Sequence, residues 1–293
     1  MTGQVAVIGL GGMGSGMALA LLRAGFQVTV FNRSPQKAEQ AARAGAAVAP
    51  SAGAAGAAAR VVLLSLADEP AVDEVLFGEV VWQLQPGTVL VDTTTVSPSF
   101  ARNTAVRLAA SGVERLEACV MGNPEMAESG RLRIFTSGSH SAVDAAGDVL
   151  SALGQEVRHL GDAGRASALK LALNLLLGIQ TAGLAEAVAF AEAAGLGRDL
   201  LLEVLLGSGW RSPVLGFRAE FMRRRTYTPA AFRTRLMHKD LELALDQATA
   251  YQLPLPLVHR AQERFAGAID AGRGDEDAAV VVEVQPPKEG TSP

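Results

Sequence analysis

A glycine-rich turn near the start of the chain constrains the fold most strongly. Gly9, Gly11 and Gly14 satisfy the pattern G-x-G-x-x-G, directly after the apolar run Gln4–Ile8 and before a stretch rich in alanine and leucine. Between a strand and a helix, the first glycine permits a tight turn, the second lets a pyrophosphate approach the backbone, and the third lets helix and strand pack closely. The alternative is a glycine-rich turn that binds nothing. The surrounding strand–turn–helix–strand pattern favours a dinucleotide contacted by Gly9, Leu10, Gly11, Gly12, Met13 and Gly14.

The residues after the second expected strand bear on which dinucleotide binds. An acidic residue about 20 positions beyond the glycines would bind the ribose hydroxyls of NAD, and it would repel a 2′-phosphate. This chain has Asn32 there, followed by Arg33 and Ser34, with Lys37 one turn into the next helix. Arginine can form paired hydrogen bonds with a phosphate, and serine can donate another. We therefore expect these four residues to favour NADP(H), although Arg33 and Lys37 could instead be ordinary solvated charges.

Short β-branched runs alternate with alanine-rich helical stretches in the first half of the chain. Such alternation predicts a Rossmann-type, doubly wound α/β fold, in which a mainly parallel sheet is covered on both faces. The strands are expected at Gln4–Ile8, Gln27–Phe31, Arg60–Leu64 and Thr88–Val91, with weaker ones around Arg115–Cys119, Arg131–Ser137 and Glu156–His159.

After Gly161 the pattern becomes helical. One long apolar helix is expected from Gly164 to about Ala194, with shorter helices after it, and the late run AVVVEV could be a strand or a last helical turn. This pattern predicts an all-helical C-terminal domain with one long central helix. We place a cofactor-binding domain at residues 1–162, a helical substrate and oligomerisation domain at 163–284, and a mobile tail at 285–293.

Composition excludes several classes of protein. The net charge of −4 gives no basic surface for a polyanion, so nucleic acid is not an expected partner. Polar residues interrupt the long apolar helix, and the N-terminus lacks the basic start of a signal peptide, so we expect a cytoplasmic protein that does not span a membrane. A single cysteine fits a reducing compartment. The four histidines show no metal-ligand spacing, so no metal is expected.

Lys170 and Asn174 are polar residues within the long apolar helix. Their spacing of four places them on one helix face. In so apolar a stretch both need polar partners or a polar cavity. A lysine there can protonate a carbonyl oxygen while a hydride is delivered, or remove the proton in the reverse direction, and Asn174 can hold the substrate oxygen or orient the lysine. A lysine that reaches solvent at the helix edge explains the spacing equally well.

Four separated segments together resemble one enzyme family. They are GLGGMGSGMALALLRAGFQVTVFNR, PGTVLVDTTTVSP, GDAGRASALKLALN and FRTRLMHKDLELAL, and their order also resembles that of the family. The family is that of the β-hydroxyacid dehydrogenases, which contains 3-hydroxyisobutyrate dehydrogenase and glyoxylate/succinic semialdehyde reductase. The resemblance extends over almost the whole chain. It implies a catalytic role for Lys170 and a substrate-side role for Asn174, and it implies cofactor contacts for Leu66, Thr95, Phe232 and Lys239, with Asp240 holding the helix of Lys239.

The segment EACVMGNPEMAESG departs from the family. Where the family often reads D-A-P-V-S-G-G, this chain has Met121 in place of the serine, followed by Gly122 and Asn123. The resemblance makes these three residues the substrate loop, but the hydroxyl that helps hold a substrate carboxylate is absent. Backbone N–H groups of Gly122 and Asn123 and the Asn123 amide remain to bind the substrate. We expect a more apolar pocket, and Cys119 to be a small buried residue.

Together these features predict an NADPH-preferring oxidoreductase, with Lys170 as general acid and base. Its substrate would be a small 2- or 3-hydroxy acid and the matching aldehyde or keto acid, such as glyoxylate or succinic or methylmalonate semialdehyde. An imine or atypical carbonyl reductase with an apolar pocket around Met121 is one alternative, and a non-catalytic NADP-binding module is another. The typical imine reductase has no lysine at the catalytic position. The long helix has more apolar surface than one small domain can cover, so a homodimer or homotetramer is expected.

Overall fold

A computed structural model describes residues 3–284 of the chain. The chain divides into two compact units, residues 1–170 and the part from Leu171 onward, and each unit is described by itself. The predicted mobile tail at 285–293 lies outside the described residues.

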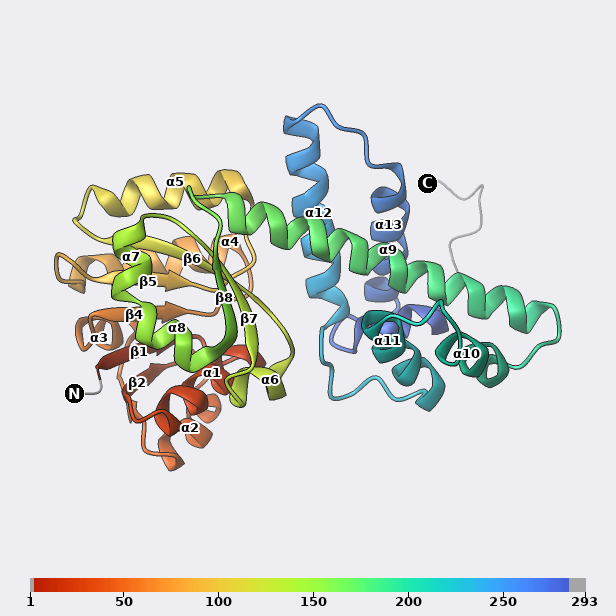
Figure 1. Ribbon diagram of the computed structural model, residues 1–293, viewed down its shortest axis with the longest axis horizontal. Helices are drawn as coiled ribbons and strands as arrows, with labels where there is room; N and C mark the ends of the chain where they lie inside the picture. The colour runs from red at the N-terminus through yellow and green to blue at the C-terminus, as the bar shows by residue number, and fades with distance from the viewer. Residues whose placement is uncertain (1–2, 285–293) are drawn as a thin grey trace. The chain divides into compact units, whose positions relative to one another are not determined.

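The first unit is built on an eight-stranded sheet in the order β3-β2-β1-β4-β5-β6-β7-β8. Neighbouring strands are parallel except for β6 and β7, which are antiparallel. Figure 1 shows helices on both faces of this sheet. The predicted doubly wound, mainly parallel fold is therefore confirmed. The strands are β1 (Gln4–Ile8), β2 (Gln27–Phe31), β3 (Ala47–Val48), β4 (Val61–Leu64), β5 (Val89–Asp92), β6 (Glu114–Met121), β7 (Leu132–Ser137) and β8 (Gly154–His159).

Alternating side chains of the central strands supply two cores, one on each face of the sheet. Val5 and Val7 of β1 pack with apolar residues of helices α1 and α8, whereas Ala6 and Ile8 pack with those of α3, α4 and α5. Successive side chains of a strand point to opposite faces, so a strand covered on both faces must be apolar throughout. The helical elements of this unit are α1 (Gly12–Arg23), η1 (Pro35–Ala38), α2 (Glu39–Arg43), α3 (Ala52–Ala57), α4 (Glu69–Val75), η2 (Leu76–Val80), η3 (Val81–Gln83), α5 (Pro98–Ala109), α6 (Pro124–Glu128), α7 (His140–Ala145) and α8 (Gly147–Leu153).

The second unit is helical in its described residues. Its core gathers fully buried residues such as Ala185, Val188 and Phe265, and the late apolar run forms a buried 3₁₀ helix, so of the two readings the helical one holds. The elements are α9 (Arg165–Ala193, which begins in the first unit), α10 (Arg198–Leu206), α11 (Pro213–Arg224), α12 (Thr234–Ala250), α13 (Pro256–Asp270) and η4 (Ala278–Glu283).

Helix α9 is long and apolar enough to cross a membrane by length and composition alone. Within the second unit, however, its residues Ala185 and Val188 are completely buried against the other helices. A core helix of a water-soluble fold passes the same test of length and composition. We therefore interpret α9 as the central helix of this unit.

Candidate cofactor and catalytic site

The three glycines of the turn between β1 and α1 differ in what surrounds them. Gly9 has φ +95°, and a Cβ there would lie 2.3 Å from the carbonyl oxygen of Ser65. A Cβ on Gly14 would lie 1.9 Å from the carbonyl oxygen of Gly9. Gly11, by contrast, has no atom within 4 Å of its would-be Cβ. The first and third glycines therefore serve the fold, while the second leaves open space beside the backbone, as a dinucleotide site requires.

The N-terminus of α1 meets the electrostatic demands of a phosphate. Its N-cap is Gly11, which supplies no side-chain cap, and its first turn contains no acidic residue. The first N–H groups of a helix lack intrahelical acceptors and carry the positive end of the helix dipole. Gly11 and Gly12 are exposed, Met13 is partly buried, and Leu10 is buried. An anion can therefore reach these backbone groups.

Asn32 links the end of β2 to the glycine turn. Its Oδ1 accepts a hydrogen bond from the N–H of Leu10 at 2.8 Å, and its Nδ2 donates to the carbonyl oxygen of Ser34 at 3.1 Å. The Ser34 hydroxyl does not cap the short helix that follows. Arg33, Ser34 and Lys37 are all exposed. Directly after Asn32, which contacts the glycine turn, the chain thus presents two exposed cations and a hydroxyl, and Asn32 itself carries no negative charge.

The carboxyl ends of β4 and β5 are joined by threonines. The Thr94 hydroxyl accepts a hydrogen bond from the N–H of Leu66 at 3.1 Å, and the Thr93 hydroxyl donates to the carbonyl oxygen of Leu64 at 2.7 Å. Leu66 and Thr95, both expected to contact the cofactor, therefore lie on neighbouring loops at the carboxyl edge of the sheet. In open α/β sheets ligands bind outside this edge.

Lys170 lies at the carboxyl end of β6. Its Nζ donates a hydrogen bond to the carbonyl oxygen of Val120 at 2.9 Å, and the residue is partly buried. Val120 directly precedes Met121 and Gly122. The structure therefore brings the predicted catalytic lysine to the start of the predicted substrate loop. The sequence did not predict Val120 as the acceptor, because every residue has a backbone carbonyl and its side chain does not show which carbonyl will accept a hydrogen bond.

The substrate loop is held in an extended turn that leads into α6. Gly122 has φ +147°, and a Cβ there would lie 2.8 Å from Cδ2 of Leu132. The side-chain oxygen of Asn123 accepts a hydrogen bond from the N–H of Met126 at 2.8 Å and so caps α6. Cys119 is buried, and burial, reinforced by the nearby Glu117 carboxylate, raises the pKa of its thiol to about 12. The thiol therefore stays protonated near neutral pH and is not an activated nucleophile.

Asn174 and the late lysine segment meet within the second unit. The Asn174 amide nitrogen donates to Oδ2 of Asp240 at 2.6 Å, and Nζ of Lys239 lies 2.9 Å from Oδ1 of the same carboxylate. Both Asn174 and Asp240 are buried, so this hydrogen bond joins α9 to α12 away from solvent. Phe232, two residues before α12, is partly buried, and its N–H donates to Asp277. Asp240 thus both orients the Asn174 amide and pairs with Lys239.

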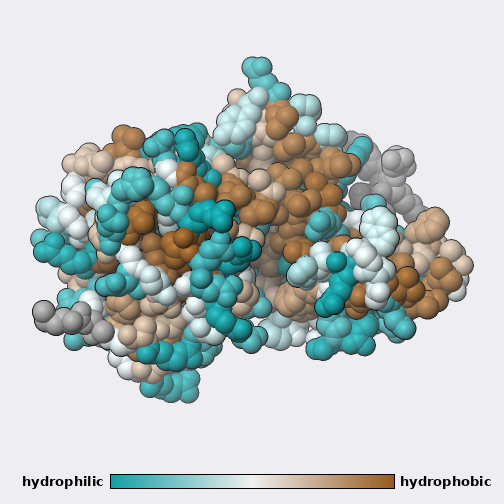
Figure 2. Space-filling view, viewed as in Figure 1, coloured by the Kyte–Doolittle hydropathy of each residue, from teal (hydrophilic) through white to brown (hydrophobic). Residues whose placement is uncertain are grey.

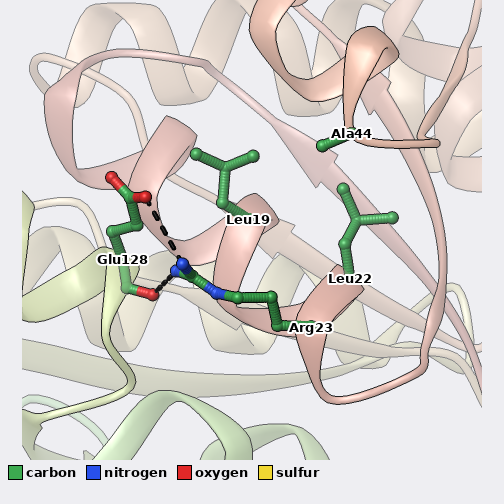
Figure 3. Close-up of a pocket in the computed structure, with 5 residues that line it drawn as sticks. All are labelled: Leu19, Leu22, Arg23, Ala44 and Glu128. Atoms are coloured by element: carbon green, nitrogen blue, oxygen red, sulfur yellow. Dashed lines mark hydrogen bonds and ion pairs between the residues drawn. The ribbon is translucent and has the colours of Figure 1, made fainter.

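A pocket lies elsewhere in the first unit, at the far end of α1. It is lined by Leu19, Leu22, Arg23, Ala44 and Glu128, and an ion pair between Arg23 and Glu128 spans it (Figure 3). The glycine turn lies at the opposite end of α1, and none of the predicted site residues lines this pocket. It is therefore not part of the cofactor site.

Comparison with known proteins agrees with this arrangement. Residues 4–161 match the NAD-binding domain of 6-phosphogluconate dehydrogenase, and residues 164–285 match the NAD-binding domain of NADP-dependent 3-hydroxyisobutyrate dehydrogenase. The L-threonate dehydrogenase of Cupriavidus necator is 36% identical over 289 residues, which cover 98% of this chain and 97% of that protein. The 2-(hydroxymethyl)glutarate dehydrogenase of Eubacterium barkeri is 32% identical over 283 residues, covering 96% and 94%. A crystal structure of 3-hydroxyisobutyrate dehydrogenase from Salmonella typhimurium superposes with a TM-score of 0.89 at 31% identity, covering 96% and 99%.

Matches of this length define an NAD(P)-dependent oxidoreductase that acts on CH–OH groups. The chain belongs to the β-hydroxyacid dehydrogenase family, and the resemblance of its four segments is confirmed.

Proposed function

We propose that this chain is an NADPH-preferring oxidoreductase that interconverts a small hydroxy acid and the corresponding aldehyde or keto acid, with Lys170 as general acid and base. The observation that carries the proposal is the hydrogen bond from Nζ of Lys170 to the carbonyl oxygen of Val120, immediately before Met121 and Gly122. This hydrogen bond holds the ammonium group of Lys170 beside the loop that, according to the family resemblance, binds the substrate.

The proposed roles divide the chemistry among a few groups. The nicotinamide of NADPH supplies a hydride when bound. Lys170 donates a proton to the carbonyl oxygen during reduction and accepts one from the hydroxyl during oxidation. An ammonium group has three donors, and the carbonyl oxygen of Val120 fixes the direction of one of them. Asn174, oriented by Asp240, positions the substrate oxygen.

The substrate class follows from the chemistry of the named relatives. L-Threonate, 3-hydroxyisobutyrate and 2-(hydroxymethyl)glutarate all carry a carboxylate and a hydroxyl on the carbon two bonds away. We propose a small acid with the same pair of groups as the first candidate. The products of reducing glyoxylate and succinic semialdehyde, in which the hydroxyl lies one bond nearer or one bond further from the carboxylate, are further candidates, as is methylmalonate semialdehyde, whose reduction gives the same pair of groups. Backbone N–H groups of Gly122 and Asn123 would hold the carboxylate, and Met121 would contact the carbon skeleton.

The cofactor preference rests on the surroundings of the glycine turn. Asn32 already donates to the backbone of Ser34, and it offers no negative charge against a 2′-phosphate. Arg33, Ser34 and Lys37 are exposed beside it. Arginine can bind a phosphate through two parallel hydrogen bonds. NADPH is therefore the proposed cofactor, and Lys239, Phe232, Leu66 and Thr95 are proposed to complete its contacts.

We also propose a cytoplasmic homodimer or homotetramer. Figure 2 shows apolar side chains gathered on the second unit in this view. Several large apolar residues of that unit are well exposed, and patches of this kind mark interfaces. A molar mass of at least twice 30.4 kDa by light scattering supports the assembly, and a mass of 30.4 kDa overturns it. The exposed apolar residues of the second unit that would form this interface are Leu176, Phe190, Leu196, Leu200, Val204, Trp210 and Leu257.

The test is turnover of a panel of acids by the purified protein, followed as NADPH absorbance at 340 nm. L-Threonate, 3-hydroxyisobutyrate and 2-(hydroxymethyl)glutarate are offered with NADP⁺, and glyoxylate and succinic and methylmalonate semialdehydes with NADPH. Faster turnover of at least one acid with the phosphorylated cofactor than with NAD(H) supports the proposal. A cyclic imine is offered with NADPH in the same assay. Turnover of this imine alone would favour an imine reductase with an apolar pocket at Met121, and bound NADPH without any turnover would indicate a non-catalytic module.

A further inference from the structure

A buried glutamate on β6 binds the start of the helix that carries Lys170. Glu117 is 1% exposed. Its Oε2 accepts hydrogen bonds from the N–H of Ser167 at 3.0 Å and from the hydroxyl of the same residue at 2.6 Å. Its Oε1 accepts from the N–H of Gly164. The first N–H groups of a helix have no intrahelical partner, so Glu117 satisfies donors that α9 would otherwise bury unpaired.

The same strand also holds the lysine. Val120, whose carbonyl oxygen accepts from Nζ of Lys170, follows Glu117 by three residues on β6, and Lys170 follows Ser167 by three residues on α9. A third contact comes from β7, where the Ser137 hydroxyl accepts from the N–H of Ala166 at 3.1 Å. The first turn of α9 and the ammonium group of Lys170 are therefore fixed against the neighbouring strands β6 and β7.

Buried charges extend from Glu117 toward the expected cofactor loops. Arg115 lies 3.6 Å from Glu117 and 2.7 Å from Asp92, and all three side chains are almost completely buried. Asp92 accepts from the N–H of Thr94 at 2.9 Å, and Thr94 in turn accepts from Leu66. The carboxylates of Asp92 and Glu117 both face the guanidinium of Arg115. The positive end of the α9 dipole lies against the Glu117 carboxylate. One polar network thus joins the ends of β4 and β5 to the start of α9.

We infer that Glu117 is a positioning residue of the reaction, because its carboxylate fixes the first turn of α9 and thereby the place of Nζ of Lys170. This inference rests on the proposed function of Lys170. A misplacement of about 1 Å at a reacting group can lower a rate about a hundredfold. The effect of losing Glu117 should therefore appear in the chemical step and not in cofactor binding.

Two variants test the inference, and they remove different numbers of the contacts between Glu117 and α9. Glu117→Gln keeps the shape of the side chain, but it removes the charge and turns one acceptor into a donor that faces N–H groups. Ser167→Ala removes the hydroxyl contact without changing any charge. We expect Glu117→Gln to lower kcat about tenfold or more, and Ser167→Ala to lower it less. The KM for the acid and the Kd for NADPH should stay within about twofold of the wild type.

Glu79→Gln is the matched control. Glu79 also accepts a hydrogen bond from the first turn of a helix, from the N–H of Gly53 in α3 at 2.9 Å, but that helix does not carry Lys170. We expect this control to lower the melting temperature without lowering kcat. An equal loss of kcat in Glu79→Gln would overturn the inference, as would a normal kcat in a Glu117→Gln protein of reduced melting temperature.

Hydrogen exchange of the amides at 166–171 gives a readout that does not depend on activity. Faster exchange there in Glu117→Gln, with wild-type exchange elsewhere in the first unit, is the expected result. Unchanged exchange in both variants would overturn the inference. A wild-type protein that turned over none of the acids would defeat the proposed function alone, and the exchange data would still decide whether Glu117 holds α9. If Glu117→Gln did not fold, Ser167→Ala would carry both readouts.

Discussion

The side-chain amide of Asn32 forms hydrogen bonds with two backbone groups, and its lack of charge bears on which cofactor binds. Its oxygen accepts from Leu10 in the glycine turn, and its nitrogen donates to the carbonyl oxygen of Ser34. An aspartate could make the first of these contacts but not the second, because a carboxylate has no donor. The sequence indicated the missing negative charge, but not these two hydrogen bonds.

Replacing Asn32 with aspartate should therefore shift the enzyme toward NADH. The new carboxylate would repel a 2′-phosphate and could accept hydrogen bonds from the ribose hydroxyls of NAD. We expect the ratio of kcat/KM for NADPH to that for NADH to fall about tenfold or more. Arg33→Ala is the companion variant, and it should weaken NADPH binding while NADH binding stays unchanged. An unaltered ratio in both variants would contradict the assigned phosphate site.

The turn between β1 and α1 has one glycine that is tightly packed and another that borders open space, so its roles in folding and in cofactor binding can be tested separately. A methyl group on Gly14 would collide with the carbonyl oxygen of Gly9, whereas one on Gly11 would meet nothing within 4 Å. Gly14→Ala should reduce the free energy of unfolding by about 1–3 kcal/mol. Gly11→Ala should change it by less than about 1 kcal/mol, yet abolish tight NADPH binding.

Chemical denaturation and NADPH titration of the two glycine variants check this contrast. A Gly11→Ala protein that binds NADPH as the wild type does would show that the open space beside Gly11 is not the pyrophosphate site. A Gly14→Ala protein of normal stability would show that α1 can move away from β1 at no cost.

The elements differed in how well the sequence predicted them. β1 and β2 were predicted to the residue, because short β-branched runs beside the glycine turn have a clear pattern, and the long apolar run of α9 was predicted to within one residue at each end. β3 was missed, since its two residues are both exposed and carry no alternation. β6 extends further in both directions than expected. β7 was predicted to within one residue at its start and to the residue at its end, but its antiparallel pairing with β6 could not be inferred, because strand direction is set by the path of the chain and not by composition.

In the candidate site, too, local patterns in the sequence identified single residues but not the partners that lie far away in the chain. Lys170 and Asn174 were found from a local spacing of four. The partner of Asn174 is Asp240, which is 66 residues away in the chain, and the family resemblance alone had drawn attention to it. Glu117 lies two residues before Cys119, at the start of the segment that departs from the family pattern. Its role as an acceptor was not predicted, because its three donors lie about 50 residues later in the chain.

At the scale of the whole molecule, the folded chain should lose stability in acid partly through Glu283. Burial opposes ionisation of this carboxyl, but hydrogen bonds from Arg198 and Tyr227 outweigh it, so its pKa in the folded protein lies below the ordinary 4.5. A carboxyl of lowered pKa stabilises the fold fully above its unfolded pKa, and this stabilisation is lost as the pH falls through the folded pKa.

The Glu283→Gln variant isolates that contribution. The difference in free energy of unfolding between wild type and variant should be largest near pH 7 and shrink as the pH falls below 4.5. Urea denaturation of both proteins at several pH values measures it. A difference that stays constant between pH 7 and pH 3.5 would show that the Glu283 charge does not stabilise the fold.

The central claim is that Lys170 transfers the proton, and the most direct measurement compares kcat of Lys170→Met and Lys170→Arg with the wild type on the best acid of the panel. Arginine keeps the positive charge and can still donate to the carbonyl oxygen of Val120, but it does not release a proton near neutral pH. We predict that both variants bind NADPH normally and lose kcat by about a hundredfold or more. If Lys170→Arg instead kept kcat within about threefold of the wild type, the charge alone would matter and the proton-transfer role would be wrong.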